Sequence, residues 1–200
     1  MPKKSENLSR DFSESERNTI SNDMHSSHLM ELFEEQLKDI LWAEKALINA
    51  IPKMITLATS ENLILTLTDH LHQTYEHVTR LAKVFKTIDK KPSTIKCDAM
   101  NELIAEASVM LEDSEKGSRC DACIITAAQK IKHYEIATYG TLREYAETLG
   151  LREAERLLLK TLEEEKEADQ NLTNVAVHEV NVSAASRKSG EPSKQMEQHE

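Results

Sequence analysis

One apolar stripe at helical spacing dominates the segment from Cys123 to Leu142. Its members follow one another at steps of three or four residues once Glu135 is counted among them: Ile124, Ala128, Ile131, Thr138 and Leu142. This spacing predicts an amphipathic helix whose stripe faces a core. Glu135 therefore lies where a hydrophobic residue is expected. A buried carboxylate is costly unless it is paired or bound to a cation, so we expect Glu135 to have a partner on another helix.

The same periodicity predicts three further long helices. The four predicted helices cover residues 26–59, 62–89, 118–149 and 151–179. In the first of them the inward stripe consists of Phe33, Leu37, Ile40, Leu47 and Ile51, again with one acid, Glu44, in register. Gly150 leaves almost no loop between the last two helices, so these two must pack antiparallel.

The connection between the second and third helices is too long for a tight turn. It opens with Lys90-Lys91-Pro92-Ser93 and then carries a short amphipathic pattern over residues 98–114. Four long helices with one long connection in the middle are typical of the ferritin-like bundle rather than of the simple up-and-down bundle. We therefore predict an all-α, ferritin-like four-helix bundle whose helix 2–helix 3 crossover contains a short extra helix.

Composition supports long helices and few loops. The 200 residues include only four Gly and four Pro, and 30 % of them are charged. We expect one ferritin-like domain over residues 26–180. The flanking segments 1–25 and 181–200 are polar and show no helical period, so both are predicted to be disordered tails.

Charge and hydropathy narrow the classes of partner. The net charge of −10 disfavours binding to nucleic acid or to a membrane surface. No run approaches the roughly 18 apolar residues of a membrane helix, and the N-terminus lacks the apolar core of a signal peptide. We therefore expect a cytoplasmic protein with no nucleic-acid and no membrane partner. Three cysteines in such a protein argue against a disulfide framework.

Each of the four long helices places an ionisable residue on its inward stripe. A di-iron or di-manganese carboxylate site takes a Glu from each of two helices and a Glu-x-x-His from each of the other two. Two divalent cations a few ångström apart need bridging carboxylates, and imidazoles complete their coordination. The pattern predicts two Fe or Mn ions held by Glu44, His70, His77, Glu135, Glu165 and Asp169.

Two positions depart from that motif. The second helix offers the neutral Gln73 beside its histidines, and the last helix has Ala168 where a His three residues after Glu165 is expected. The alternative is a buried polar network without metal, in which Glu–His pairs fix the helix register. We interpret the acidic run at residues 163–167 as a solvated face from which only Glu165 points inward.

Several segments resemble one known family in the right order. They are AEKAL (43–47), HLHQT with HVTRL (70–81), AAQKIKHYEIATYGTL (127–142) and TLEEEKEAD (161–169). On these segments residues 26–178 resemble the YciE/YciF family of bacterial ferritin-like proteins. The resemblance implies a rubrerythrin-like four-helix domain, usually dimeric and linked to general or osmotic stress. Members of that family tend to carry Glu where this chain has His72 or Gln73, and also where it has Lys132.

Three functional hypotheses follow. The first is a bacterial stress protein that binds two Fe or Mn ions and handles peroxide or ferrous iron. The second is a non-catalytic stress protein whose bundle serves assembly or protection. The third is a thiol redox sensor that uses Cys120 and Cys123, whose C-x-x-C spacing is equally compatible with ordinary buried thiols.

We also expect a homodimer. The short crossover helix carries more apolar residues than one contact face requires, namely Leu103, Ile104, Ala107, Met110 and Leu111. One side of this helix can cover the bundle while the other meets a second copy through a two-fold contact.

Overall fold

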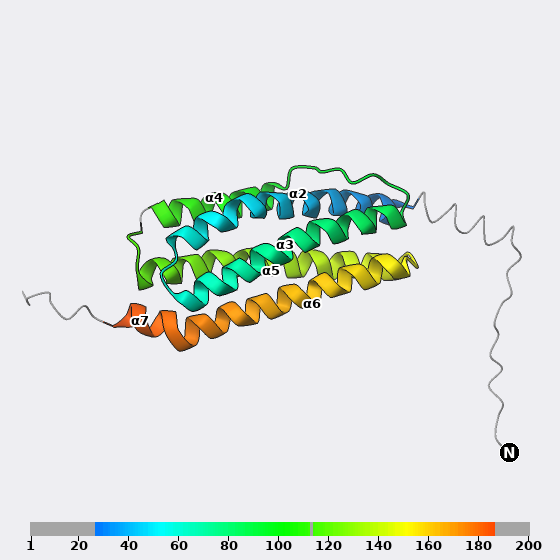
Figure 1. The fold of residues 1–200 in the computed structure, drawn as a ribbon. Helices are drawn as coiled ribbons and strands as arrows, with labels where there is room; N and C mark the ends of the chain where they lie inside the picture. The colour runs from blue at the N-terminus through cyan, green and yellow to red at the C-terminus, as the bar shows by residue number, and fades with distance from the viewer. Residues whose placement is uncertain (1–26, 113, 187–200) are drawn as a thin grey trace, which may run out of the picture.

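Four long helices lie side by side in the computed structural model, which describes residues 27–112 and 114–186 (Figure 1). They are α2 (His28–Leu57), α3 (Glu61–Thr87), α5 (Ser118–Thr148) and α6 (Arg152–Val175). A shorter helix, α4 (Asp98–Glu112), follows the long connection and packs on α5 and α2. The described residues contain no strand, which confirms the predicted all-α class.

Local signals in the sequence set the helix ends. The Ser27 hydroxyl accepts a hydrogen bond from the Met30 amide at 3.2 Å, and the Ser60 hydroxyl accepts one from the Leu63 amide at 3.1 Å. Gly150 adopts the left-handed conformation, with φ 70°, directly after α5, and this allows the abrupt reversal into α6. The four long helices therefore begin and end close to the predicted positions.

The C-terminal boundary differs from the prediction. Helix α6 continues through a π-helical turn, η1 (Ala176–Val180), into α7 (Asn181–Ala185), so helix extends past residue 180. Val180 is buried and holds this last stretch against the bundle. The predicted tail at 1–25 and residues 187–200 of the other predicted tail lie outside the described residues.

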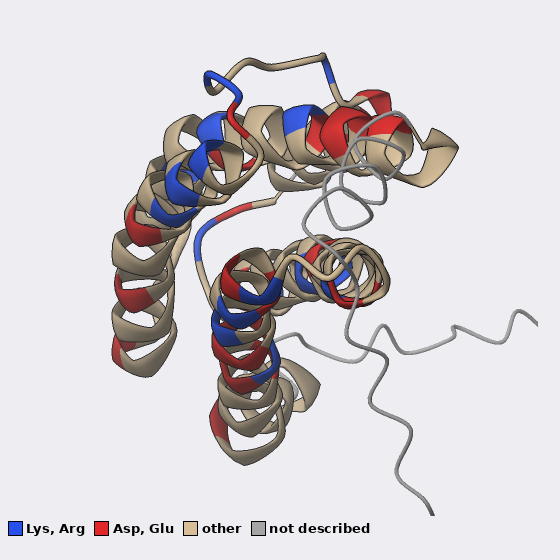
Figure 2. Cartoon of the chain, turned by 90° about the vertical axis from the view of Figure 1, so that its right-hand side faces the viewer, with Lys and Arg blue, Asp and Glu red and all other residues tan. Residues whose placement is uncertain are grey.

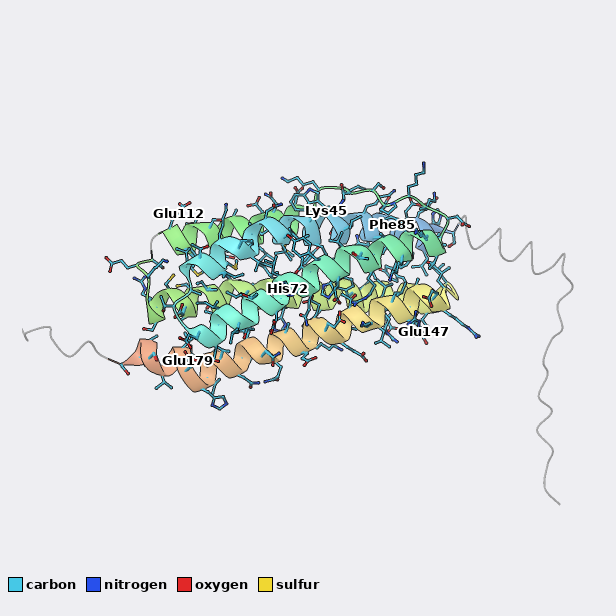
Figure 3. The ribbon with its side chains drawn as sticks, in the orientation of Figure 1. Lys45, His72, Phe85, Glu112, Glu147 and Glu179 are labelled. Carbon is cyan, nitrogen blue, oxygen red and sulfur yellow. The ribbon has the colours of Figure 1, made fainter. Side chains whose placement is uncertain are left out.

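The four long helices surround a common centre, seen end-on in Figure 2. Helix α2 packs on α3 and α5, and α6 packs on α3 and α5. Side chains fill the space between them (Figure 3). Apolar residues form the core toward both ends, and most of the buried ionisable residues lie between these apolar layers. Within residues 27–112 and 114–186, no helix combines the length and apolarity that crossing a membrane requires.

One predicted core position is displaced by a residue. Thr138 was expected on the inward stripe of α5, but it is only partly buried, whereas the adjacent Tyr139 is fully buried. A straight helix has 3.6 residues per turn, so a stripe that alternates steps of three and four drifts around the helix over several turns. The drift brings Tyr139 inward beyond Glu135.

Candidate metal centre

Three carboxylates and two imidazoles meet in the middle of the bundle. Glu44 comes from α2, His70 and His77 from α3, Glu135 from α5 and Glu165 from α6, and all five are buried. Their oxygen and nitrogen atoms form two groups, Glu44–His77–Glu165 and His70–Glu135–Glu165, and within each group these atoms lie within 4.8 Å of one another. The two groups share Glu165. Five of the six residues predicted as ligands are thus brought together.

Asp169 does not join either group. Its side chain is partly exposed, and its Oδ1 lies 3.5 Å from Nε2 of the exposed His133 on α5. Four residues after Glu165, the helix has turned further than a full turn, so Asp169 faces the α5 edge rather than the centre.

Lys132 is the principal residue of the centre that the helical periodicity of the sequence does not reveal. It is fully buried on α5, and its ammonium Nζ lies 2.6 Å from Oε2 of Glu135 and in contact with Oε2 of Glu165. Burial alone would lower the pKa of Lys132, but the two carboxylates outweigh it and raise the pKa above its ordinary value. The signal available in the sequence was the resemblance to the YciE/YciF family, which implies a Glu at position 132.

His77 connects the centre to the α6 surface. Its Nδ1 lies 3.3 Å from Oε1 of Glu44 and 3.1 Å from Oε1 of Glu165, without a well-directed hydrogen bond to either. Its Nε2 lies 3.0 Å from Oε2 of Glu164. Burial would lower the pKa of His77, but the Glu44 carboxylate and its other acidic neighbours raise it to about 11. The surrounding carboxylates of Glu44, Glu164 and Glu165 thus favour the imidazolium form of His77.

Glu164 corrects the interpretation of residues 163–167 as solvated apart from Glu165. Its side chain is only 19 % exposed. Its carboxylate accepts two hydrogen bonds from Arg80, at 2.5 Å from Nη1 and at 3.1 Å from Nη2. Burial would raise the pKa of Glu164, but the hydrogen bonds with His77 and Arg80 lower it to about 2. Arg80 Nη1 also donates to the Thr161 hydroxyl at 2.6 Å, so α3 and α6 are joined beside the centre.

The pKa values of the remaining ionisable groups of the centre are shifted in different directions. The Tyr139 hydroxyl donates to Oε1 of Glu44 at 2.5 Å, and burial together with Glu44 raises the pKa of Tyr139 well above its ordinary value. Burial and the adjacent Glu165 raise the pKa of Glu135 well above its usual range, whereas Lys132 and His77 outweigh burial at Glu165 and lower its pKa. Burial and Lys132 keep His70 neutral by lowering its pKa.

The donor set does not fit two metal ions. Two positions of the Glu-x-x-His motif carry no ligand: Thr74 three residues before His77, and Ala168 three after Glu165. The Thr74 hydroxyl is already used, because it donates to the His70 carbonyl at 3.0 Å. Lys132 also places a positive charge against two carboxylates that a pair of ions would have to share.

The Glu44–His77–Glu165 group retains atoms that are available as metal ligands. Among the residues that the structure describes, Oε2 of Glu44, Nδ1 of His77 and Oε1 of Glu165 have no hydrogen-bond partner. Carboxylate and imidazole donors of this kind suit a single divalent ion such as iron or manganese. The second group also contains buried atoms without a hydrogen-bond partner, on His70 and Glu135, but there the Lys132 ammonium lies against both carboxylates.

The cysteines offer little support for a thiol sensor. Cys97, Cys120 and Cys123 are all free thiols, and Cys120 is fully buried. Burial raises the pKa of the Cys120 thiol, which opposes formation of the reactive thiolate. The Cys97 sulfur instead accepts a hydrogen bond from the Met100 amide at 3.3 Å and lies 3.0 Å from the Tyr134 hydroxyl. Cys97 therefore helps to hold the first turn of α4 on α5.

The fold and the centre define the class of protein: it is an all-helical bundle with carboxylates, imidazoles and a lysine buried at its centre. Comparison with known proteins specifies it further: residues 28–185 match a domain family of unknown function, DUF892. The chain is 40 % identical over 165 residues to Protein YciF of Escherichia coli (strain K12). The matched region covers 82 % of this chain and 99 % of YciF. The chain therefore belongs to the DUF892 family that includes YciF, as its sequence resemblance predicted.

Two solved structures are similar. The crystal structure of the E. coli stress protein YciF has a TM-score of 0.74 and 41 % identity, and the match covers 78 % of this chain and 98 % of that one. YcfI from Rhodopseudomonas palustris, described as a candidate structural protein, has a TM-score of 0.73 and 40 % identity, with coverage of 76 % and 96 %.

Proposed function

We propose that this protein is a stress-associated, non-catalytic bundle with a structural or protective role, whose central ionisable groups neutralise one another without metal. The observation that carries the proposal is the placement of the Lys132 ammonium against Glu135 and Glu165. The relatives support the role, since YciF is called a stress protein and YcfI a candidate structural protein.

The charges around the centre balance within the protein. Three carboxylates, on Glu44, Glu164 and Glu165, face three cations, on Lys132, His77 and Arg80. Glu135 also contacts the Lys132 ammonium, and burial together with the adjacent Glu165 raises its pKa. Because every carboxylate already has a cation within contact distance, the fold does not require a metal ion for neutrality.

Such a network favours specificity over reactivity. Buried ion pairs contribute little net stability compared with apolar packing, but an unpaired partner is heavily penalised, so they select one helix register. The same contacts occupy one carboxylate oxygen of Glu135 and one of Glu165, the residues that a two-metal oxidase would use to bind its ions.

Thermal unfolding tests this proposal. The protein is expected to unfold at the same midpoint in EDTA as in excess manganese, and to oxidise ferrous iron no faster than buffer does. Circular dichroism measures the midpoint, and absorbance measures ferric iron. A midpoint that falls in EDTA and recovers with metal, or catalysed iron oxidation, would contradict the proposal.

A second candidate function is binding of one divalent ion by Glu44, His77 and Glu165. The unpartnered oxygens of Glu44 and Glu165 favour it. His77 would have to lose its proton to bind the ion, because a metal-bound imidazole is deprotonated at the ligating nitrogen. Retention of one iron or manganese per chain, lost in Glu44→Gln, would select this candidate over the metal-free bundle.

A further inference from the structure

We propose that Lys132 takes the place of a metal ion in the His70–Glu135–Glu165 group, and that this one residue keeps a metal ion out of that group. The inference deepens the proposed function, on which it rests, by assigning the resident cation of the centre to a side chain.

Geometry places the ammonium where a bridging cation would lie. Lys132 Nζ contacts one oxygen of Glu135 and one of Glu165, which come from different helices. These two carboxylates and His70 form one of the two groups whose ligand atoms lie within 4.8 Å of one another. Residues three apart share a helix face, so Lys132 reaches the centre beside Glu135 rather than from outside.

The Lys132 side chain does not reach solvent. A lysine at the edge of a core usually runs its aliphatic stem along apolar surface and keeps its amine in water. Here the side chain is fully buried, and the adjacent residues on the inward face, Ile131 and Glu135, are buried as well. The ammonium is therefore part of the core.

A tethered cation competes strongly with a free one. Because Lys132 is covalently attached at the site, its effective concentration there far exceeds that of any dissolved metal ion. An entering ion would also meet the positive charge of the ammonium at short range. Replacing the lysine by a glutamate would remove one positive charge, add one negative charge and supply a further oxygen ligand.

The test compares Lys132→Glu with Lys130→Glu. Lys130 is on the same helix but exposed, and it pairs at 2.5 Å with the exposed Glu106, so both variants change the net charge equally. Each metal-free protein is incubated anaerobically with manganese and desalted. Bound metal is counted by inductively coupled plasma mass spectrometry, and the unfolding midpoint is recorded with and without manganese.

We expect Lys132→Glu to retain one manganese ion more per chain than the wild type, and its unfolding midpoint to rise with metal. Lys130→Glu should match the wild type in both measurements. Equal metal content in the two variants, with no change in midpoint, would overturn the inference while leaving the metal-free proposed function intact. Two ions per chain in the wild type would overturn both.

A neutral variant covers the case in which Lys132→Glu does not fold with or without metal. Lys132→Met keeps the length of the side chain but leaves Glu135 and Glu165 without their cation. We expect its midpoint to lie below that of the wild type in EDTA and to rise in manganese. A midpoint unaffected by manganese would refute the role assigned to Lys132.

Discussion

The role of a single charged residue in this bundle depends on what faces it from another helix. Glu163 and Glu164 are adjacent acids on α6, yet Glu163 is exposed whereas Glu164 is partly buried between His77 and Arg80. The difference arises because α3 packs on the α6 face that carries Glu164. Two adjacent, chemically identical side chains are therefore expected to contribute very differently to stability.

Glu164→Gln should lower the free energy of unfolding by about 1.5–3 kcal/mol, because it removes charge-assisted hydrogen bonds to Arg80 and His77. Glu163→Gln is the matched control and should change it by less than about 0.5 kcal/mol. Urea unfolding at pH 7 measures both changes. Equal effects in the two variants would show that the Glu164 contacts do not stabilise the fold.

The same pair of variants predicts a pH dependence with a definite sign. The pKa of Glu164 is lowered to about 2 in the folded protein, from an ordinary 4.5. A carboxylate with a lowered folded pKa stabilises fully above its unfolded value and loses that contribution as pH falls through its folded value. The difference between wild type and Glu164→Gln should thus be largest above pH 4.5 and shrink toward pH 2.

Periodicity located the acids of the centre but not their cation. Glu44, Glu135 and Glu165 could be found because an acid on an apolar stripe breaks the pattern. Lys132 could not, because it lies one residue beside the stripe and a lysine there is normally assigned to the surface. Helix α5 is covered by α4 as well as by α2 and α6, so its buried face is wider than a single stripe predicts.

At the scale of elements, one aspartate joins the ends of three helices. Asp121, in the first turn of α5, accepts hydrogen bonds from the Thr59 amide at 2.7 Å, the Thr59 hydroxyl at 2.6 Å and the Ser60 amide at 3.0 Å. Thr59 and Ser60 form the turn between α2 and α3. The carboxylate therefore satisfies backbone donors that this short turn leaves unpaired and aligns it with the start of α5.

Asp121→Ala should lower the free energy of unfolding by about 3 kcal/mol, since it leaves the buried Ser60 amide and the part-buried Thr59 amide without acceptors. The control is Asp98→Ala, an exposed acid in the first turn of α4 that pairs with the exposed Lys96. A surface pair of this kind contributes about 0–1 kcal/mol. Chemical denaturation compares the two, and a small, equal loss in both would refute the anchoring role of Asp121.

The helix positions follow closely from sequence because their signals are local. Serine caps, the left-handed Gly150 and long apolar periods act within a few residues, so the bounds of α2, α3 and α5 could be predicted well. The continuation beyond residue 180 into α7 could not, because this stretch is held by contacts of η1 and α7 with α5 that no local pattern reveals.

At the scale of the whole molecule, an apolar groove lies between α2 and α4. It has a volume of about 510 Å³, and its lining includes Trp42, Met54, Ile104 and Leu111. On α4, Ala107 and Leu111 are buried, whereas Ile104 is only partly buried. This face supports our expectation of a homodimer, because α4 covers the bundle with one side and leaves apolar surface on the other.

Light scattering after size exclusion should therefore give a mass near two chains, where one chain is 22.7 kDa. Ile104→Asp should shift the protein toward a single chain, because it places a charge in the proposed contact. Leu65→Asp, at an exposed apolar position on α3, is the control and should leave the dimer intact. A wild-type mass near one chain across micromolar concentrations would contradict the dimer.

Counting the metal ions on the wild-type protein tests most directly whether its own side chains supply the cations of the centre. Native mass spectrometry after anaerobic exposure to excess ferrous iron or manganese, followed by desalting, gives the number retained per chain. The contacts of Lys132 with Glu135 and Glu165 predict fewer than two ions per chain. Two tightly retained ions per chain would contradict this account.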